Sequence, residues 1–216
     1  MTSEENARPR GRPALPVERI LTAALELVDE QGTEALSMRS LAQRLESGTA
    51  TLYRHFSSRA ELIAAMIDRI LGGVDLDPPT RGPWQQACMS FAQHMFDALS
   101  RHPNVASLLI EYTPVGPNAL AGRELCLSIL LENGFTPPIA AHAYATLARF
   151  VLGFAIQVSG AAGPEHDAKL ATAFHELDAA HYPATRATAD ELPVPLREEF
   201  AFGLQLIIAG LELLHR

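Results

Sequence analysis

Cysteine, lysine and long uninterrupted apolar runs are all scarce in this sequence of 216 residues. The two cysteines, Cys88 and Cys126, have no C-x-x-C spacing and no secretory signal before them, which argues against a disulfide framework or a metal cluster. A membrane span needs roughly eighteen apolar residues, and no uninterrupted apolar run in this sequence approaches that length. We therefore expect a cytoplasmic protein with no membrane partner.

Basic charge is limited and unevenly distributed. The net charge is -8, and 16 of the 17 basic residues are arginine. Residues 1–72 carry nine basic against ten acidic residues, whereas residues 73–216 carry eight against fifteen. Three arginines lie within residues 8–12 without an acid, and four lie within residues 33–60 against two acids. The sequence therefore predicts two local basic patches in an acidic protein.

Helical periodicity dominates, and strand-like alternation is absent. Apolar residues recur every three or four positions in residues 17–32, and shorter patterns follow Ser37 and Gly48. Residues 58–61, Ser-Arg-Ala-Glu, match a capping box at the start of a fourth helix. Body helices are expected near residues 83–101, 103–112, 117–133, 137–160, 165–178 and 194–214, with residues 181–195 forming a long loop.

These patterns predict an all-α fold with three parts. Residues 1–15 are polar and form a flexible basic arm, and residues 16–72 form a helix-turn-helix DNA-binding domain. Residues 73–216, which begin at a stretch rich in proline and glycine, form a helical body that binds a ligand and dimerises.

The stretch GTATLYRHF, residues 48–56, has the properties of a helix that enters the major groove. Leu52 and Phe56 lie four residues apart and are expected to pack inward. Small residues and hydrogen-bond donors then cover the remaining surface, where they can reach phosphates and base edges. The alternative is a solvated helix face that binds nothing.

Residues 20–66 resemble the DNA-binding head of the tetracycline-repressor (TetR) family of bacterial regulators, most of all in TLYRHF and the serine that follows. The resemblance implies a double-stranded DNA operator, a homodimer and a small-molecule effector, with repression as the expected activity. Glu46-Ser47 stands where the family commonly has a glycine and an apolar residue. The residues that the resemblance and the helix pattern assign to DNA are Met38, Arg39, Thr49, Ala50, Thr51, Tyr53, Arg54, His55 and Arg59.

The arm contains RPRGRP, a sequence similar to an AT-hook, in which arginines lie in a narrow minor groove. Arg10 and Arg12 are the candidate contacts. A solubilising tail that does not touch DNA explains the same sequence equally well.

The body resembles the C-terminal domain of the tetracycline repressor more loosely, through ENGF at residues 132–135 and FVLGF at residues 150–154. In an ungapped alignment from ENGF, two residues that hold magnesium in that repressor fall at Ile110 and Gln157. Neither is a good ligand for a hard cation. We therefore expect no metal, no cofactor and a different effector.

Aromatic and sulfur-containing residues with a few polar neighbours suggest a pocket for a largely apolar molecule. Helical spacing also suits such residues to an ordinary core. The candidate ligand-binding residues are Phe91, His94, Met95, Tyr112, Thr113, Cys126 and Phe154. Residues 140–156 and 200–214 are more apolar than one buried face requires, which predicts a two-fold interface of four helices.

An enzyme is the main alternative of another class. HELDAAH, residues 175–181, superficially resembles a zinc motif, but its histidines are six residues apart and face about 120° away from each other on a helix. No nucleophile elbow or Gly-rich phosphate loop is present. We expect no catalysis. An architectural DNA-binding protein that responds to no ligand is a further alternative.

Overall fold

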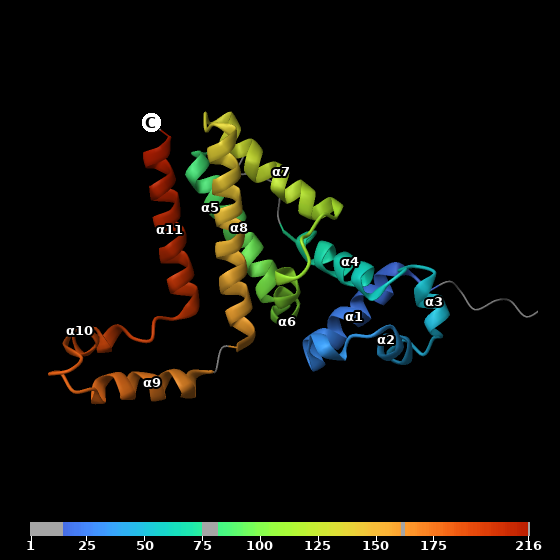
Figure 1. The fold of residues 1–216 in the computed structure, drawn as a ribbon, viewed down its shortest axis with the longest axis horizontal. Coiled ribbons are helices and arrows are strands. Elements are labelled where there is room, and N and C mark those ends of the chain that lie inside the picture. Colours follow the sequence, from blue (N-terminus) through green and yellow to red (C-terminus); the bar gives the residue numbers. More distant parts are fainter. Residues whose placement is uncertain (1–14, 75–81, 161–162, 216) are drawn as a thin grey trace, which may run out of the picture.

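The computed structural model describes residues 15–74, 82–160 and 163–215, and within them it contains helices and turns but no strand (Figure 1). The predicted all-α fold is confirmed. A head of four helices lies at one end of the molecule and the body helices pack against it. The head helices are α1 (Val17–Gln31), α2 (Met38–Arg44), α3 (Thr49–Tyr53) and α4 (Arg59–Leu71).

Local signals explain where the head helices begin and end. Gly32, at φ 82°, ends α1 in a conformation that glycine adopts without steric cost. Ser37 and Ser40 form a reciprocal cap at the start of α2. At α4 the Ser58 hydroxyl accepts from the Glu61 amide, but the Glu61 carboxylate accepts from Ser57. The predicted capping box is thus only half right.

The turn between α2 and α3 contains an unusual backbone conformation. Glu46 has a φ of 50°, the only positive φ of a non-glycine residue among those described. Side chains other than glycine meet steric repulsion in this left-handed region. The turn therefore has the geometry for which glycine is best suited, although the sequence places glutamate there.

The body is built around α8, which contacts α5, α6, α7 and α11. Prolines at the first positions of α6, α7 and α8 start these helices as expected, because an amide hydrogen is not needed there. The body helices are α5 (Trp84–Ser100), α6 (Pro103–Ala106), α7 (Pro117–Glu132), α8 (Pro137–Gly160), α9 (Pro164–Glu176), α10 (Pro183–Ala187) and α11 (Leu196–Leu214).

Two expectations about the body need correction. The helix predicted over residues 103–112 is the four-residue α6 followed by the 3₁₀ helix η2 (Ser107–Ile110). The loop predicted over residues 181–195 contains α10 and the 3₁₀ helix η3 (Ala189–Glu191). In residues 103–112 the periodic pattern does not distinguish an α-helix from a 3₁₀ helix, and in residues 181–195 the helices are too short for the pattern to reveal them. Figure 1 shows α9 and α10 extending away from the α5–α8 bundle.

The structure contains one helix that is a candidate membrane span, whereas the sequence analysis expected none. Within the described residues, Pro137–Val158 of α8 is long and apolar enough to cross a membrane by length and composition alone. The search for an uninterrupted run missed it because His142 and Arg149 interrupt the segment. One side of it packs against four other helices, α5, α6, α7 and α11. Only 28% of its most apolar window is buried, so much of the segment forms surface in the single chain.

The helix α4 joins the head to the body. It packs against α1 in the head and against α5 and α7 in the body. Buried residues of α1 to α8 and of α11 form one continuous hydrophobic cluster. A shift of α4 relative to α7 must therefore disturb the packing on both sides.

Candidate DNA-binding surface and ligand cavity

The helix α3 has the inward and outward faces that the sequence predicts. Leu52 is fully buried and Phe56, just beyond the helix, is 5% exposed. Both anchor the segment to α1 and α2 through the head core. The remaining candidates lie outward: Thr49, Ala50, Tyr53 and Arg54 are exposed, and Thr51 and His55 are half-buried.

Two of the other predicted DNA contacts have different surroundings. The Met38 side chain is only 7% exposed and belongs to the core, so it cannot project toward a duplex. Arg59 donates from Nε to the Leu36 carbonyl (2.7 Å) and from its terminal nitrogen to the Thr33 carbonyl (3.1 Å). Its guanidinium thus ties α4 to the connection before α2, which is a structural role.

Ion pairs balance part of the positive charge in the predicted basic patch of the head. Arg44 pairs with Glu30 at 2.6 Å and with Glu26 at 3.3 Å, both on α1. Arg39 and Arg54 are exposed and have no carboxylate partner among the described residues. The exposed positive charge near α3 that no carboxylate balances therefore comes from these two side chains, while the half-buried Arg59 keeps its charge beside two carbonyl groups. Arg10 and Arg12 lie outside the described residues.

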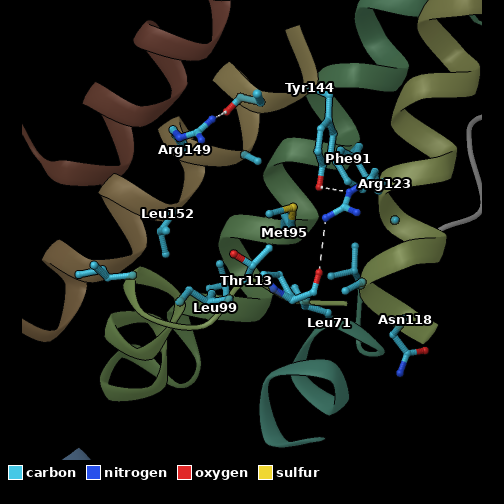
Figure 2. Close-up of a pocket in the computed structure, with 18 residues that line it drawn as sticks. Leu71, Phe91, Met95, Leu99, Thr113, Asn118, Arg123, Tyr144, Arg149 and Leu152 are labelled. Carbon is cyan, nitrogen blue, oxygen red and sulfur yellow. Dashed lines mark hydrogen bonds between the residues drawn. The ribbon is translucent and has the colours of Figure 1, made fainter. Parts of the chain in front are cut away.

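A cavity of about 560 Å³ lies between α4 and the body helices α5, α7 and α8, with the η2 segment beside it. The predicted residues Phe91, Met95 and Thr113 line it, as Figure 2 shows. The volume falls within the range of sites for small organic ligands. The other lining residues are Leu71, Val74, Leu99, Leu109, Ile110, Pro114, Asn118, Ala119, Gly122, Arg123, Tyr144, Ala145, Ala148, Arg149 and Leu152.

Four predicted ligand contacts do not line this cavity: His94, Tyr112, Cys126 and Phe154. Phe154 instead packs in an aromatic cluster, with ring centroids 4.9 Å from Phe150 and 5.5 Å from Phe200. Tyr112 packs against the hydrophobic core. The Cys126 thiol is fully buried beside Cys88, and this contact together with its burial raises the pKa of Cys126. The helical period gave no means of separating core residues from cavity residues.

The sequence interpretation missed the polar side chains of the cavity, above all Arg123 on α7 and Tyr144 on α8. Arg123 donates from Nε to the Tyr144 hydroxyl (3.3 Å) and from a terminal nitrogen to the Pro114 carbonyl (3.4 Å). Its guanidinium carbon lies 5.6 Å from the Tyr144 ring centroid. The available signal was weak: Arg123 is the one basic residue of 117–131, but the acidic Glu124 follows it directly.

The positions considered for metal binding have other surroundings. Ile110 lines the cavity, and the Gln157 side chain donates to the Gly153 carbonyl of its own helix. The described residues contain no group of three or more His, Cys, Asp or Glu side chains that could hold a metal ion. In HELDAAH, His175 lies 3.5 Å from Asp190 and His181 lies 2.6 Å from Asp178, so the two histidines have separate partners.

Two family models match the chain. Residues 20–66 match the model described as bacterial regulatory proteins, tetR family, and residues 77–214 match that of the tetracyclin repressor-like C-terminal domain. The chain is 29% identical to the HTH-type transcriptional repressor DrrR1 of Streptomyces coeruleorubidus, over 94% of this chain and 79% of that protein. It is 30% identical to an HTH-type transcriptional regulator of Saccharopolyspora erythraea, over 94% and 86%.

Solved structures give the same result. Apo ActR from Streptomyces coelicolor superposes with a TM-score of 0.83 at 32% identity, covering 93% of this chain and 96% of that chain. ActR in complex with actinorhodin superposes with a TM-score of 0.81 at 30% identity, over 91% and 96%.

Proposed function

This chain belongs to the TetR family of bacterial regulators and is a ligand-responsive transcriptional regulator, and from that premise we propose that it represses transcription as a homodimer on a near-palindromic operator. A small molecule bound in the α4–α8 cavity releases it from DNA. The observation that carries the proposal is that Leu71, the last residue of α4, and Val74, just after the helix, line the cavity while α4 also packs against α1 of the head.

The DNA surface consists of the outward residues of α3 together with the start of α2. Thr49, Ala50 and Thr51 meet base edges or phosphates, while Tyr53, Arg54 and His55 contact the backbone. Arg39 adds a phosphate contact, and Met38 can contribute only its main-chain amide. Arg59 is left out because its guanidinium is held by two carbonyl groups. Arg10 and Arg12 stay candidates for the adjacent minor groove.

The homodimer is supported by an apolar surface on α8 and α11. Phe202, Leu206 and Leu213 on α11 are 63%, 58% and 66% exposed in the single chain. Contiguous apolar surface of this kind is typical of an interface between subunits. Two copies of α8 and α11 would bury it in a four-helix arrangement and present two α3 helices to one face of a duplex.

Release follows from the position of α4. A ligand that fills the cavity contacts Leu71 and Val74, so it favours the α4 position that best accommodates it. Because α4 packs against the head, its displacement changes the separation of the two α3 helices. ActR has been solved in complex with actinorhodin and with (S)-DNPA, which supports a small-molecule effector for this chain. We also propose that the protein acts in the cytoplasm. Its three parts are the arm (residues 1–15), the DNA-binding domain (residues 16–72) and the body that binds ligand and dimerises (residues 73–216).

The test is selection of DNA fragments by the purified protein, followed by sequencing and affinity measurements. We expect an inverted repeat, one bound dimer per site and weaker DNA binding when the cavity is filled. A ligand-independent architectural protein would instead keep the same DNA affinity with every bound small molecule. Failure to bind any duplex at low salt would overturn the proposal.

A further inference from the structure

The cavity contains a positive charge with little to balance it. None of the residues that line it is acidic, and two of them, Arg123 and Arg149, are basic. Arg149 is an exposed residue and donates to the Ala145 carbonyl of its own helix. Arg123 is half-buried, and its guanidinium lies against Tyr144 (Figure 2).

The hydrogen bonds of Arg123 are too few and too long to satisfy it. A guanidinium offers five N–H donors in one plane, and the two bonds described for Arg123, at 3.3 and 3.4 Å, go to uncharged oxygens. By contrast, Arg44 and Arg197 pair with carboxylates at 2.6 and 2.8 Å. A partly buried cation without a counter-charge leaves part of its desolvation cost uncompensated.

Tyr144 extends the polar site. Its oxygen accepts from Arg123 Nε, so its own O–H hydrogen stays available to donate. Its ring also lies against the guanidinium, which favours one orientation of the arginine side chain. An oxyanion beside Arg123 can therefore accept from the guanidinium and from the phenol together.

The apolar residues of the cavity determine what the uncharged part of the ligand must look like. The lining side chains present aromatic, sulfur and aliphatic groups: Phe91, Met95 and Leu99 from α5, Leu71 at the end of α4, and Val74 just after it. Such a surface binds a flat or bulky apolar body. With its volume of about 560 Å³, the cavity has room for a molecule of two to several rings.

From these observations, and resting on the proposed function, we infer that the effector is an aromatic carboxylate. Its carboxylate binds Arg123 in a bidentate manner and accepts from Tyr144, while its ring system packs between Phe91 and α4. Because the same molecule touches Leu71 and Val74, neutralising Arg123 and displacing α4 become one event. Neutral molecules of the same shape can displace α4 but cannot neutralise the charge of Arg123.

Two fluorescent probes with one ring system test the inference: 1-pyrenebutyrate, a carboxylate, and 1-pyrenebutanol, its neutral counterpart. We expect the protein to bind the butyrate at least about 10-fold more tightly, because charge-assisted bidentate hydrogen bonds are among the strongest in proteins. In Arg123→Met the two affinities should become equal, with the butanol affinity unchanged. Arg123→Lys should recover part of the preference.

Arg149→Met is the matched control, since it removes the other cavity arginine, which is exposed and bonded to its own helix. It should keep most of the preference, and circular dichroism should show the same helix content in all variants. Equal wild-type affinities, no binding of either probe, or the same loss in both methionine variants would overturn the inference. DNA affinity measured in the same samples separates this result from failure of the repressor function, which would show as no DNA binding at all.

Discussion

The carboxylate of Asp68 on α4 accepts hydrogen bonds from both the main-chain amide and the side-chain amide of Asn118 on α7, each at 3.0 Å. It also accepts from the Ala119 amide at 3.0 Å. A head helix thus caps a body helix whose own N-cap residue, Gly116, has no side chain to do so. A Cβ at Gly116 would lie 2.3 Å from the Asp68 carboxylate, so glycine is required for this approach.

Asp68→Ala should therefore lower both stability and the response to ligand. Loss of the cap leaves amides at the start of α7 without an acceptor, which costs about 1 to 2 kcal/mol in the free energy of unfolding. Because Asn118 and Ala119 also line the cavity, the ratio of DNA affinities without and with ligand should shrink toward one.

Urea denaturation and DNA titrations measure the two effects of Asp68→Ala. Asp190→Ala is the control. The Asp190 side chain is 90% exposed, and its replacement removes only an ion pair with His175 at 3.5 Å. An unchanged affinity ratio in Asp68→Ala would show that this contact does not transmit the ligand signal.

Tyr53→Phe should weaken binding to the selected DNA about 5- to 10-fold, because one hydrogen bond to a charged phosphate is lost. The dependence of affinity on salt should stay the same, since the hydroxyl is neutral.

Arg54→Ala should in contrast reduce the slope of log affinity against log salt by about 1. Fluorescence anisotropy at several salt concentrations measures both quantities.

Tyr182→Phe is a matched control for Tyr53→Phe, because the two tyrosines are 54% and 53% exposed and Tyr182 lies beside α10. It should leave DNA affinity unchanged. Equal effects of the two substitutions would place Tyr53 outside the DNA contact.

Glu46→Gly should stabilise the head. The left-handed backbone at φ 50° costs glutamate about 1 kcal/mol or more, and glycine avoids this cost while losing more entropy on folding. The expected net gain is about 0.5 to 1 kcal/mol, measured as a shift in the urea midpoint at constant slope. Glu34→Gly, in a segment without a positive φ, should have the opposite sign.

Leu206→Glu should convert the protein to a monomer and abolish binding to the full inverted repeat. The side chain is 58% exposed in the single chain, so the charge is tolerated there but would be buried without a partner in the dimer. Sedimentation velocity measures the change. Val17→Glu, at an exposed apolar position of the head, should remain dimeric, and a dimeric Leu206→Glu would move the interface elsewhere.

Much of the fold could be predicted because the signals are local. Prolines at helix starts and Gly32 after α1 set boundaries within a residue or two. The inward Leu52 and outward Tyr53 follow from the 3.6-residue period and one buried side. The TLYRHF motif made the head recognisable before any contact was known.

The ligand site was harder to predict because it depends on which helices are neighbours. Phe91 and Phe154 are both aromatic residues on apolar helices, yet one lines the cavity and the other packs against Phe150 and Phe200. The two carbonyl partners of Arg59 lie 23 and 26 residues earlier in the chain, so no local pattern indicates them.

By itself, then, the sequence determined the longer helices, their buried sides and the outward residues of α3, since these follow from periodicity and caps within a few residues. Only the tertiary structure decided that Arg123 bonds to Tyr144 beside a cavity and that Asp68 caps α7. Those contacts join residues 21 and 51 positions apart, and no local rule specifies which distant polar groups a folded chain brings together.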